Sequence, residues 1–452
     1  MKMSLWNWLK SLPGPQIKVE PPGPKSREII KKGEKVLATS TREEFYPAIA
    51  KMEGDVIWDV DGNIYIDFFA GVAVLNVGSR NPEVIQAIQT QLNRFIHDAP
   101  QDFYDEIQVI AAEKLASVAP GNFSKKVFFA NSGAESVECA MKVAQLARKA
   151  HWFIAFVPSF HGRTLGSLAL TASKKVHRKG YLVYPYVEHV PYSYCYRCPY
   201  KLTPDVCDVW CAKIIEEILF EHYIDPNDVA AIFVEPITGE GGYVVPHPKF
   251  IPTLRKICDK HGILLVSDEV QMGFGRTGKW WGIQNFDVVP DVMTCAKSIA
   301  AGVPLGACVF NAKYDFPYPG AHSSTYGGNA LALAAMVKVI EIIEREKLYE
   351  RARKLGEQGL KKLKDELEDN PIVGDIRGLG LAQGIEIVKD KKTKAFAPDL
   401  RDEIIKRCVK KGLLLLPCGK STIRIAPPLI IREEMYEKGL DIIIDSIKEV
   451  SK

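Results

Sequence analysis

The chain has 452 residues, of which 47% are apolar and 25% charged, the composition of an ordinary globular protein. It is too long for one compact core, so we expect two or three lobes. Its net charge of +4 and the lack of a basic run interleaved with aromatics argue against nucleic-acid binding. No apolar stretch reaches the roughly 20 residues that span a membrane, so we expect a soluble cytoplasmic protein that does not bind membranes.

Residues 1–80 are predicted to form an N-terminal arm and part of a small domain. Residues 1–12 have neither the apolar core nor the cleavage site of a signal peptide, so we expect a helix that packs on the body or on a partner. An extended, proline-rich arm with a short helix at 26–34 follows. The Asp-Gly turn within 55–67 predicts a β-hairpin, and the glycine-broken segment 68–74 is expected to line a pocket or the core.

Residues 81–335 alternate helices with short buried strands. This pattern is typical of a large α/β domain with a mainly parallel central sheet and helices on both faces. The predicted strands are 126–130, 153–157, 230–234, 263–266, 289–294 and 305–310. The predicted helices are 82–95, 105–119, 134–149 and 330–345.

Residues 336–452 are predicted to form a smaller α+β terminal lobe, in which helices pack against a small mixed sheet. The predicted helices are 348–367, 400–411 and 432–450, and the predicted strands are 378–387, 413–416 and 422–425.

Four of the ten cysteines form one cluster, with the spacing Cys195-x2-Cys198-x8-Cys207-x3-Cys211. The spacing resembles that of a metal-binding loop. A surface insertion closed by one or two disulfides, or one with free thiols, explains it equally. The surrounding tyrosines and prolines indicate an insertion away from the chemistry, and no other metal site is expected.

An acid and an amine follow two predicted strands of the sheet. Asp268 and Gln271 come after the first strand, and Lys297 comes after the next. The carboxyl ends of parallel strands are where such sheets bind ligands. A carboxylate beside a pyridine nitrogen keeps that nitrogen protonated, and a lysine whose pKa is lowered can form a Schiff base. The pair therefore predicts a pyridine cofactor, with Gln271 donating a hydrogen bond to a ring hydroxyl.

Three other segments lie at predicted strand ends. Asn131 to Glu135 offers small residues at a helix N-terminus, which favours an anion, although an ordinary helix cap explains them too. In the segment from Phe160 to Arg163, the aromatic ring can stack on a cofactor ring and the arginine can bind a carboxylate. The alternative is an ordinary loop whose arginine forms a solvated salt bridge. Glu235 to Gly242 brings two carboxylates, for which Arg424 is a candidate partner. Otherwise these are surface charges.

Together these motifs resemble the class III pyridoxal-phosphate (PLP) aminotransferases, in the subgroup of the 4-aminobutyrate, ornithine and acetylornithine enzymes. The resemblance runs in order from about Gly54 to the C-terminus, and it implies fold type I, with 81–335 as the PLP-binding domain. It implies cofactor contacts by Ser132, Gly133, Ala134, Phe160, His161, Glu235, Asp268, Gln271 and Lys297, the last through an aldimine. Thr325 would bind the phosphate from the other subunit of a homodimer or higher assembly with shared active sites.

The resemblance also implies how substrates bind. Arg163 and Arg424 would hold the substrate carboxylates, Glu240 would cover Arg424 when a donor has no group to place there, and Val72 would line the donor pocket. Two departures weaken the transfer of substrate identity. The segment 78–82 lacks the family's two histidines, and Thr238 stands where a glutamine is common.

The leading hypothesis is a ping-pong aminotransferase that moves an amino group from an ω-amino acid or amine to 2-oxoglutarate through Lys297. Its small-molecule partners are thus an amine donor and a keto-acid acceptor. A PLP-dependent amino-acid racemase on the same scaffold is the alternative. A non-catalytic interaction protein is a third hypothesis, against which the intact Asp268 and Lys297 argue.

Overall fold

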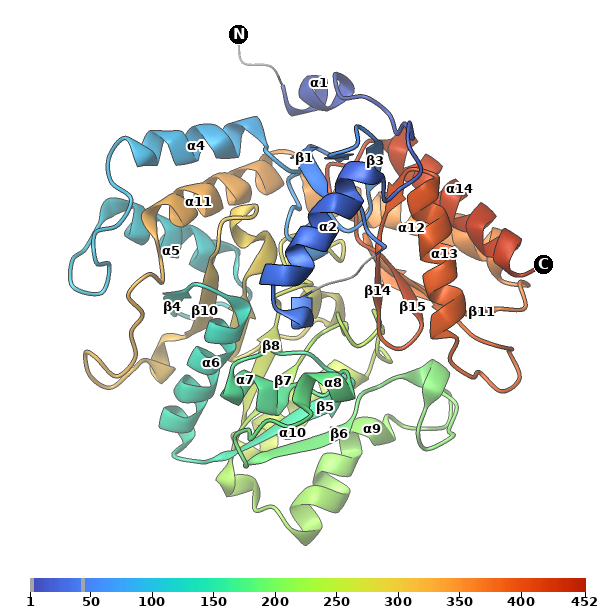
Figure 1. Cartoon of the computed structure of the whole chain (residues 1–452). Coiled ribbons are helices and arrows are strands. Elements are labelled where there is room, and N and C mark those ends of the chain that lie inside the picture. Colours follow the sequence, from blue (N-terminus) through green and yellow to red (C-terminus); the bar gives the residue numbers. More distant parts are fainter. Residues whose placement is uncertain (1–3, 42–44) are drawn as a thin grey trace.

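The computed structural model describes residues 4–41 and 45–452 (Figure 1). Its largest sheet has seven strands in the order β4-β10-β9-β8-β7-β5-β6. β10 is antiparallel to both of its neighbours, and every pair from β9 to β6 is parallel, so the predicted mainly parallel sheet is confirmed. The strands are β4 (Lys125–Ala130), β5 (Trp152–Val157), β6 (Val187–Pro191), β7 (Val229–Val234), β8 (Leu264–Asp268), β9 (Val292–Cys295) and β10 (Gly306–Asn311).

Helices cover both faces of this sheet because its strands are apolar on both sides. Along β5, Phe153 and Ala155 belong to the core formed with α6, whereas Ile154 and Phe156 belong to the core formed with α10. Successive side chains of a strand point to opposite faces, so an unbroken apolar run indicates cover on both. The helices here are α4 (Pro82–Leu92), α5 (Glu106–Val118), α6 (Gly133–Arg148), α7 (Leu165–Leu170), α8 (Lys175–Arg178), α9 (Trp210–Ile214), α10 (Phe250–His261) and α11 (Ala330–Arg345).

The smaller lobe combines strands from both ends of the chain in two four-stranded sheets, β1-β2-β3-β13 and β11-β12-β15-β14. β13 pairs in parallel with β3, which joins the two ends of the chain, and the predicted α+β lobe is confirmed. The strands are β1 (Ile49–Glu53), β2 (Val56–Asp59), β3 (Ile64–Asp67), β11 (Val373–Leu379), β12 (Ala382–Ile387), β13 (Leu413–Leu414), β14 (Leu416–Cys418) and β15 (Thr422–Ile425). The helices are α12 (Leu348–Leu367), α13 (Pro398–Lys410) and α14 (Glu433–Val450). The domain limits at 80 and 335 stay a prediction.

The N-terminal segment packs on the body, as predicted. In α1 (Leu5–Lys10) the indole of Trp8 donates to Glu53 at 3.2 Å, and the indole of Trp6 donates to Glu346 at 2.9 Å. α2 (Pro24–Val36) is longer than the predicted helix, and β2 and β3 form the predicted hairpin. The glycine-broken segment contains the single turn α3 (Ala70–Ala73).

Three strand predictions differ from the structure. The single strand predicted at 378–387 is wrong, because β11 and β12 form an antiparallel hairpin there. Its turn contains Gly380 at φ +54°, a left-handed conformation that glycine adopts readily. The segment 413–416 is divided between two sheets, and the short strands β1 and β6 were not predicted.

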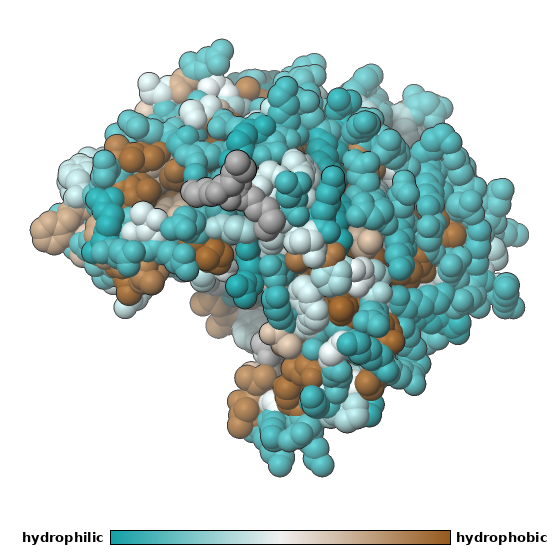
Figure 2. Space-filling model, turned by 90° about the horizontal axis from the view of Figure 1, so that it is seen from above, coloured by the Kyte–Doolittle hydropathy of each residue, from teal (hydrophilic) through white to brown (hydrophobic). Residues whose placement is uncertain are grey.

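Hydrophobic residues gather beside a hollow on the face seen in Figure 2, which is otherwise mostly hydrophilic. Large apolar side chains that the fold leaves exposed include Phe103, Tyr104, Tyr318 and Tyr326, and Tyr104 is 95% exposed. Within the described ranges, no helix combines the length and the apolar character needed to cross a membrane. Exposed apolar groups of this kind mark candidate protein contact surfaces.

Candidate active site

A cavity of about 390 Å³ opens at the carboxyl ends of the parallel strands. Asp268 is the last residue of β8, Glu235 follows β7, Phe160 lies three residues after β5, and Lys297 lies two residues after β9. Because parallel strands end at the same edge, residues far apart in sequence meet here. The lining residues that the sequence predicts for the site are Ser132, Gly133, Ala134, Phe160, His161, Arg163, Glu235, Glu240, Asp268, Gln271 and Lys297.

Three of the predicted residues do not line this cavity, and one of them, Thr325, was expected at the cavity of a second copy. Thr325 is exposed, and Val72 is replaced at the cavity wall by its neighbour Val74. Val72 has φ +67°, within a left-handed turn that carries Val74 toward the cavity instead. Arg424 does not line the cavity itself. It donates a hydrogen bond to Glu240, which does line the cavity.

Asp268 and His161 form the buried floor of the cavity. Nδ1 of His161 lies 2.7 Å from Oδ2 of Asp268, and the other carboxylate oxygen accepts from the backbone N–H of Val270 at 3.0 Å. Burial alone would lower the pKa of His161, but its contact with Asp268 raises that pKa above the usual value. Among the described residues Nε2 of His161 has no partner. The pair therefore fixes a carboxylate in an orientation suited to a cationic ring nitrogen.

Lys297 brings an amine with an altered pKa to the same cavity. Burial and the nearby charge of Arg424 lower its pKa to about 8. Its backbone φ is +45°, a strained conformation for a residue with a side chain. Since a lower pKa leaves more of the amine neutral near physiological pH, Lys297 can act as a nucleophile and as a proton carrier.

Glu235 ties two cavity loops together. It accepts hydrogen bonds from the backbone N–H of Phe160 at 2.8 Å and of Gly239 at 2.7 Å. Burial raises its pKa to about 7. It therefore fixes the backbone at Phe160 relative to the loop that carries Glu240.

The N-terminus of α6 forms an anion cradle at one end of the cavity. Ser132 caps this helix by accepting from the N–H of Glu135 at 3.2 Å. A Cβ on Gly133 would lie 2.9 Å from Val270, so only glycine leaves room for close approach to the backbone. These features suit a phosphate group.

The opposite end of the cavity is charged. Oε2 of Glu240 lies 2.5 Å from Nη2 of Arg424 on β15, and Oε1 lies 2.6 Å from Nζ of Lys174. Burial alone would raise the pKa of Glu240, but the two cations hold it below the usual value. Sequence reasoning missed Lys174, because nothing in the run from Ala172 to Lys175 distinguishes it from a surface lysine.

Phe160 is packed between a cation and an imidazole. Its ring lies 5.4 Å from the guanidinium of Arg163 and meets the ring of His177 edge-on at 5.5 Å. Burial and the charge of Arg163 lower the pKa of His177 to about 4, so this imidazole is neutral at physiological pH. The arrangement holds the aromatic ring beside an arginine of the cavity wall, whose guanidinium can bind a carboxylate.

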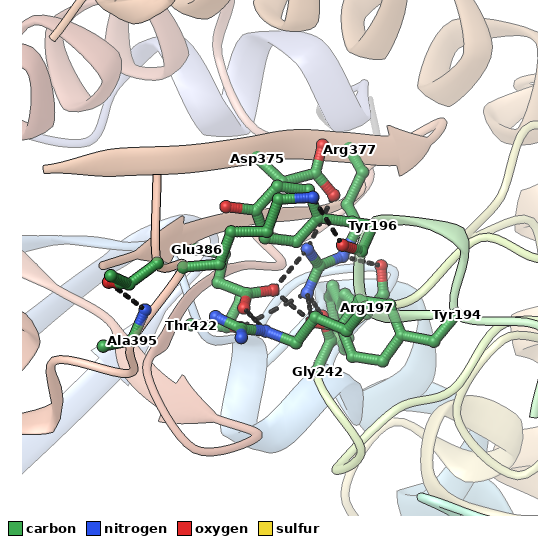
Figure 3. Close-up of polar contacts among 12 residues, drawn as sticks. Tyr194, Tyr196, Arg197, Gly242, Asp375, Arg377, Glu386, Ala395 and Thr422 are labelled. Carbon is green, nitrogen blue, oxygen red and sulfur yellow. Dashed lines mark hydrogen bonds and ion pairs between the residues drawn. The ribbon is translucent and has the colours of Figure 1, made fainter. Parts of the chain in front are cut away.

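A buried network of charged residues is hydrogen-bonded to the loop that carries Glu240 (Figure 3). Arg377 on β11 donates to Glu386 on β12 at 2.7 Å and to the carbonyl oxygen of Gly242 at 2.7 Å. Glu386 also accepts from Tyr194 and Arg197, which belong to the cysteine-rich insertion. The network thus joins the insertion, the terminal lobe and the loop that carries Glu240.

The four clustered cysteines are free thiols in the structure, which is one of the three alternatives that the sequence left open. All four line one cavity of about 20 Å³. No group of three or more metal-binding side chains lies close enough to hold an ion in the part of the chain that the structure describes. Burial raises the pKa of Cys211 to about 11, which favours the neutral thiol. The insertion is joined to Glu386 by the ion pair of Arg197 and by the hydrogen bond from Tyr194.

Comparison with known proteins identifies the family. The family model for "Aminotransferase class-III" matches residues 38–447. An alanine/serine racemase of Pyrococcus horikoshii is 36% identical over 443 residues, which cover 96% of this chain and 93% of that protein. A 4-aminobutyrate aminotransferase of Escherichia coli is 38% identical over 418 residues, covering 90% and 95%. The ω-transaminase of Pseudomonas jessenii in complex with PMP is 28% identical, with a TM-score of 0.86 and coverage of 93% and 97%.

The cavity also fits the cofactor. It has an anion cradle at Ser132 and Gly133, and a carboxylate at Asp268 for the ring nitrogen. The buried amide oxygen of Gln271 has no hydrogen-bond partner among the described residues, so it can accept a hydrogen bond from a ring hydroxyl, whereas the sequence predicted that Gln271 would donate one. Lys297 lies on the same cavity wall. The chain therefore belongs to the class-III aminotransferase family, the pyridoxal-phosphate-dependent transaminases.

Proposed function

We propose that the protein transfers the amino group of an ω-amino acid or amine, of 4-aminobutyrate or ornithine type, to 2-oxoglutarate. The pairing of Glu240 with Arg424 carries this proposal, since a buried guanidinium is neutralised there by a carboxylate whose side chain is 23% exposed. Such a site can present a neutral pair to one substrate and a free cation to another. It therefore suits two substrates that differ by one carboxylate.

The residues of the cavity have separate roles in this reaction. PLP, when bound, supplies a ring that withdraws electrons from the substrate carbon. Asp268 would hold the ring nitrogen, Gln271 the ring hydroxyl, and Phe160 one face of the ring. Lys297 moves a proton on its Nζ to and from the substrate carbon, for which a pKa near 8 is suited.

The two arginines distinguish the donor from the acceptor. Arg163 and Arg424 would each bind one carboxylate of 2-oxoglutarate, with Glu240 displaced from Arg424. A donor with a single carboxylate would use Arg163 and leave the Glu240–Arg424 pair intact. The relative named 4-aminobutyrate aminotransferase supports this donor class.

A donor panel tests the proposal. Holoenzyme is incubated with 4-aminobutyrate, 5-aminovalerate, ornithine, acetylornithine, lysine or leucine, at a fixed concentration of 2-oxoglutarate, and glutamate is measured. We expect glutamate with ω-amino donors and none without a donor. Absence of glutamate with every donor would contradict the proposal.

A racemase is the second candidate, because a relative that is 36% identical is named alanine/serine racemase. Racemisation removes the α-proton and returns it on the opposite face, so it needs no keto acid. Single L-amino acids are therefore incubated with and without 2-oxoglutarate. A D-amino acid formed without the keto acid would favour the racemase.

We also propose a homodimer with shared active sites. The exposed apolar side chains of Phe103, Tyr104 and Tyr326 support it, as does the exposure of Thr325 outside the cavity of its own chain. Thr325 would then complete the phosphate site of a second copy. Sedimentation analysis tests the assembly, and weaker cofactor binding by Thr325→Ala, without a change in the thermal midpoint of the apoprotein, tests the shared contact.

A further inference from the structure

Glu240 lies between two cations that differ in burial. One of its oxygens contacts Arg424, whose side chain is 2% exposed, and the other contacts Lys174, whose side chain is 30% exposed. Glu240 itself is 23% exposed. The carboxylate therefore contacts one buried cation and one cation that is partly exposed.

Arg424 keeps hydrogen-bond donors without a partner among the described residues while Glu240 is in place. Within the described residues, its Nε and Nη1 are buried and have no hydrogen-bond partner. Its Nη2 is shared between Glu240 and the carbonyl oxygen of Pro417, at 2.5 and 3.2 Å. An arriving carboxylate would compete with Glu240 for a guanidinium that already has two free donors. Repulsion between the two carboxylates would then move Glu240 away.

The displaced Glu240 needs a new counter-charge because it remains partly buried. Lys174 already contacts its other oxygen at 2.6 Å, on the side nearer to solvent. His177 is the nearby imidazole, and its pKa of about 4 leaves it without charge at physiological pH. Among the described residues, the ion pairs of Glu240 are those with Arg424 and Lys174.

We propose that Lys174 is a positioning residue that holds Glu240 when a substrate carboxylate occupies Arg424. Lys174 thereby sets the affinity for dicarboxylic acceptors without changing the affinity for monocarboxylic donors. This inference rests on the proposed function, because it assumes that both substrate types use the same cavity.

Ligand binding to the holoenzyme tests the inference without turnover. Glutarate serves as the dicarboxylate probe and butyrate as the monocarboxylate probe, and their Kd values are measured by calorimetry. We expect Lys174→Met to raise the Kd of glutarate about fivefold, the upper end of what a partly exposed ion pair contributes. The Kd of butyrate should not change. Lys174→Arg should restore glutarate binding, and Lys175→Met, at the exposed neighbouring position, should leave both Kd values unchanged.

A double variant separates action through Glu240 from direct attraction of the ligand. In a Glu240→Gln background no charge needs a new partner, so adding Lys174→Met should no longer alter glutarate binding. An effect of Lys174→Met that persists in this background would overturn the inference, as would equal glutarate binding by the wild type and by Lys174→Met. Failure of the wild type to bind glutarate would instead overturn the proposed function together with the inference.

Discussion

The two ends of the cavity are built differently. At the cofactor end, Asp268 and His161 are buried at the ends of strands and bonded to each other. At the substrate end, Glu240 and Lys174 are partly exposed and come from loops, and Glu240 contacts Arg424 on a strand of a second sheet. Fixed buried groups suit a cofactor that stays in one orientation, whereas a carboxylate held by two cations suits substrates that alternate. The following predictions test this contrast.

Removal of the Lys297 amine should cause the largest loss of activity. Lys297→Ala leaves no group to carry the proton, so we expect the single-turnover rate to fall by on the order of 10⁴-fold or more with every donor. The rate is followed by rapid-mixing spectroscopy of the holoenzyme. Lys175→Ala, at an exposed position, is the control and should retain the full rate. Turnover by Lys297→Ala would remove Lys297 from the chemistry.

Neutralising Asp268, in the floor of the cavity, should cause the next largest loss of activity. Asp268→Asn removes the charge opposite the ring nitrogen, so we expect kcat to fall by about 10²- to 10³-fold for donor and acceptor alike. Asp287→Asn, at an exposed position, is the matched control. If the loss were confined to one half-reaction, the cofactor end would not be the uniform site described above.

A change at the substrate end should separate the two half-reactions. Arg424→Lys loses bidentate binding of a carboxylate, so we expect kcat/KM for 2-oxoglutarate to fall on the order of 10²-fold. The donor half-reaction, in which Glu240 covers this position, should change much less. Each half-reaction is measured by itself, with the other serving as its internal control. Equal losses in both would contradict the separate roles of the two ends.

The pKa of Lys297 predicts a smaller, pH-dependent effect. Its neutral amine is the nucleophile that captures the cofactor, and its pKa is lowered to about 8. Capture by the apoprotein should therefore accelerate roughly tenfold from pH 7 to pH 8.5 and then level off. Stopped-flow absorbance measures this rate. A rate that continues to rise toward pH 10 would show an amine with an ordinary pKa.

The sequence predicted six of the seven strands of the central sheet because these are mostly apolar runs followed by polar residues, whereas the missed strand β6 is interrupted by Glu188 and His189. Asp268 and Lys297 could be recognised because each lies at the end of such a run. Lys174 could not, because its role depends on a contact with a residue 66 positions away. The hairpin of β11 and β12 was missed because Gly380 reverses an apolar run that resembles one strand. The sequence could not show that Val74 lines the cavity in place of Val72. Which of the two faces the cavity depends on a left-handed turn at Val72, and that turn leaves no pattern in the sequence.

A sequential single-turnover experiment tests the proposed function most directly. Holoenzyme is treated with 4-aminobutyrate or ornithine, freed of donor by gel filtration, and then mixed with 2-oxoglutarate. We predict the release of about one glutamate per active site, because the cavity stores the amino group between the two half-reactions. Absence of glutamate, together with formation of a D-amino acid from an L-amino acid without any keto acid, would contradict the proposal.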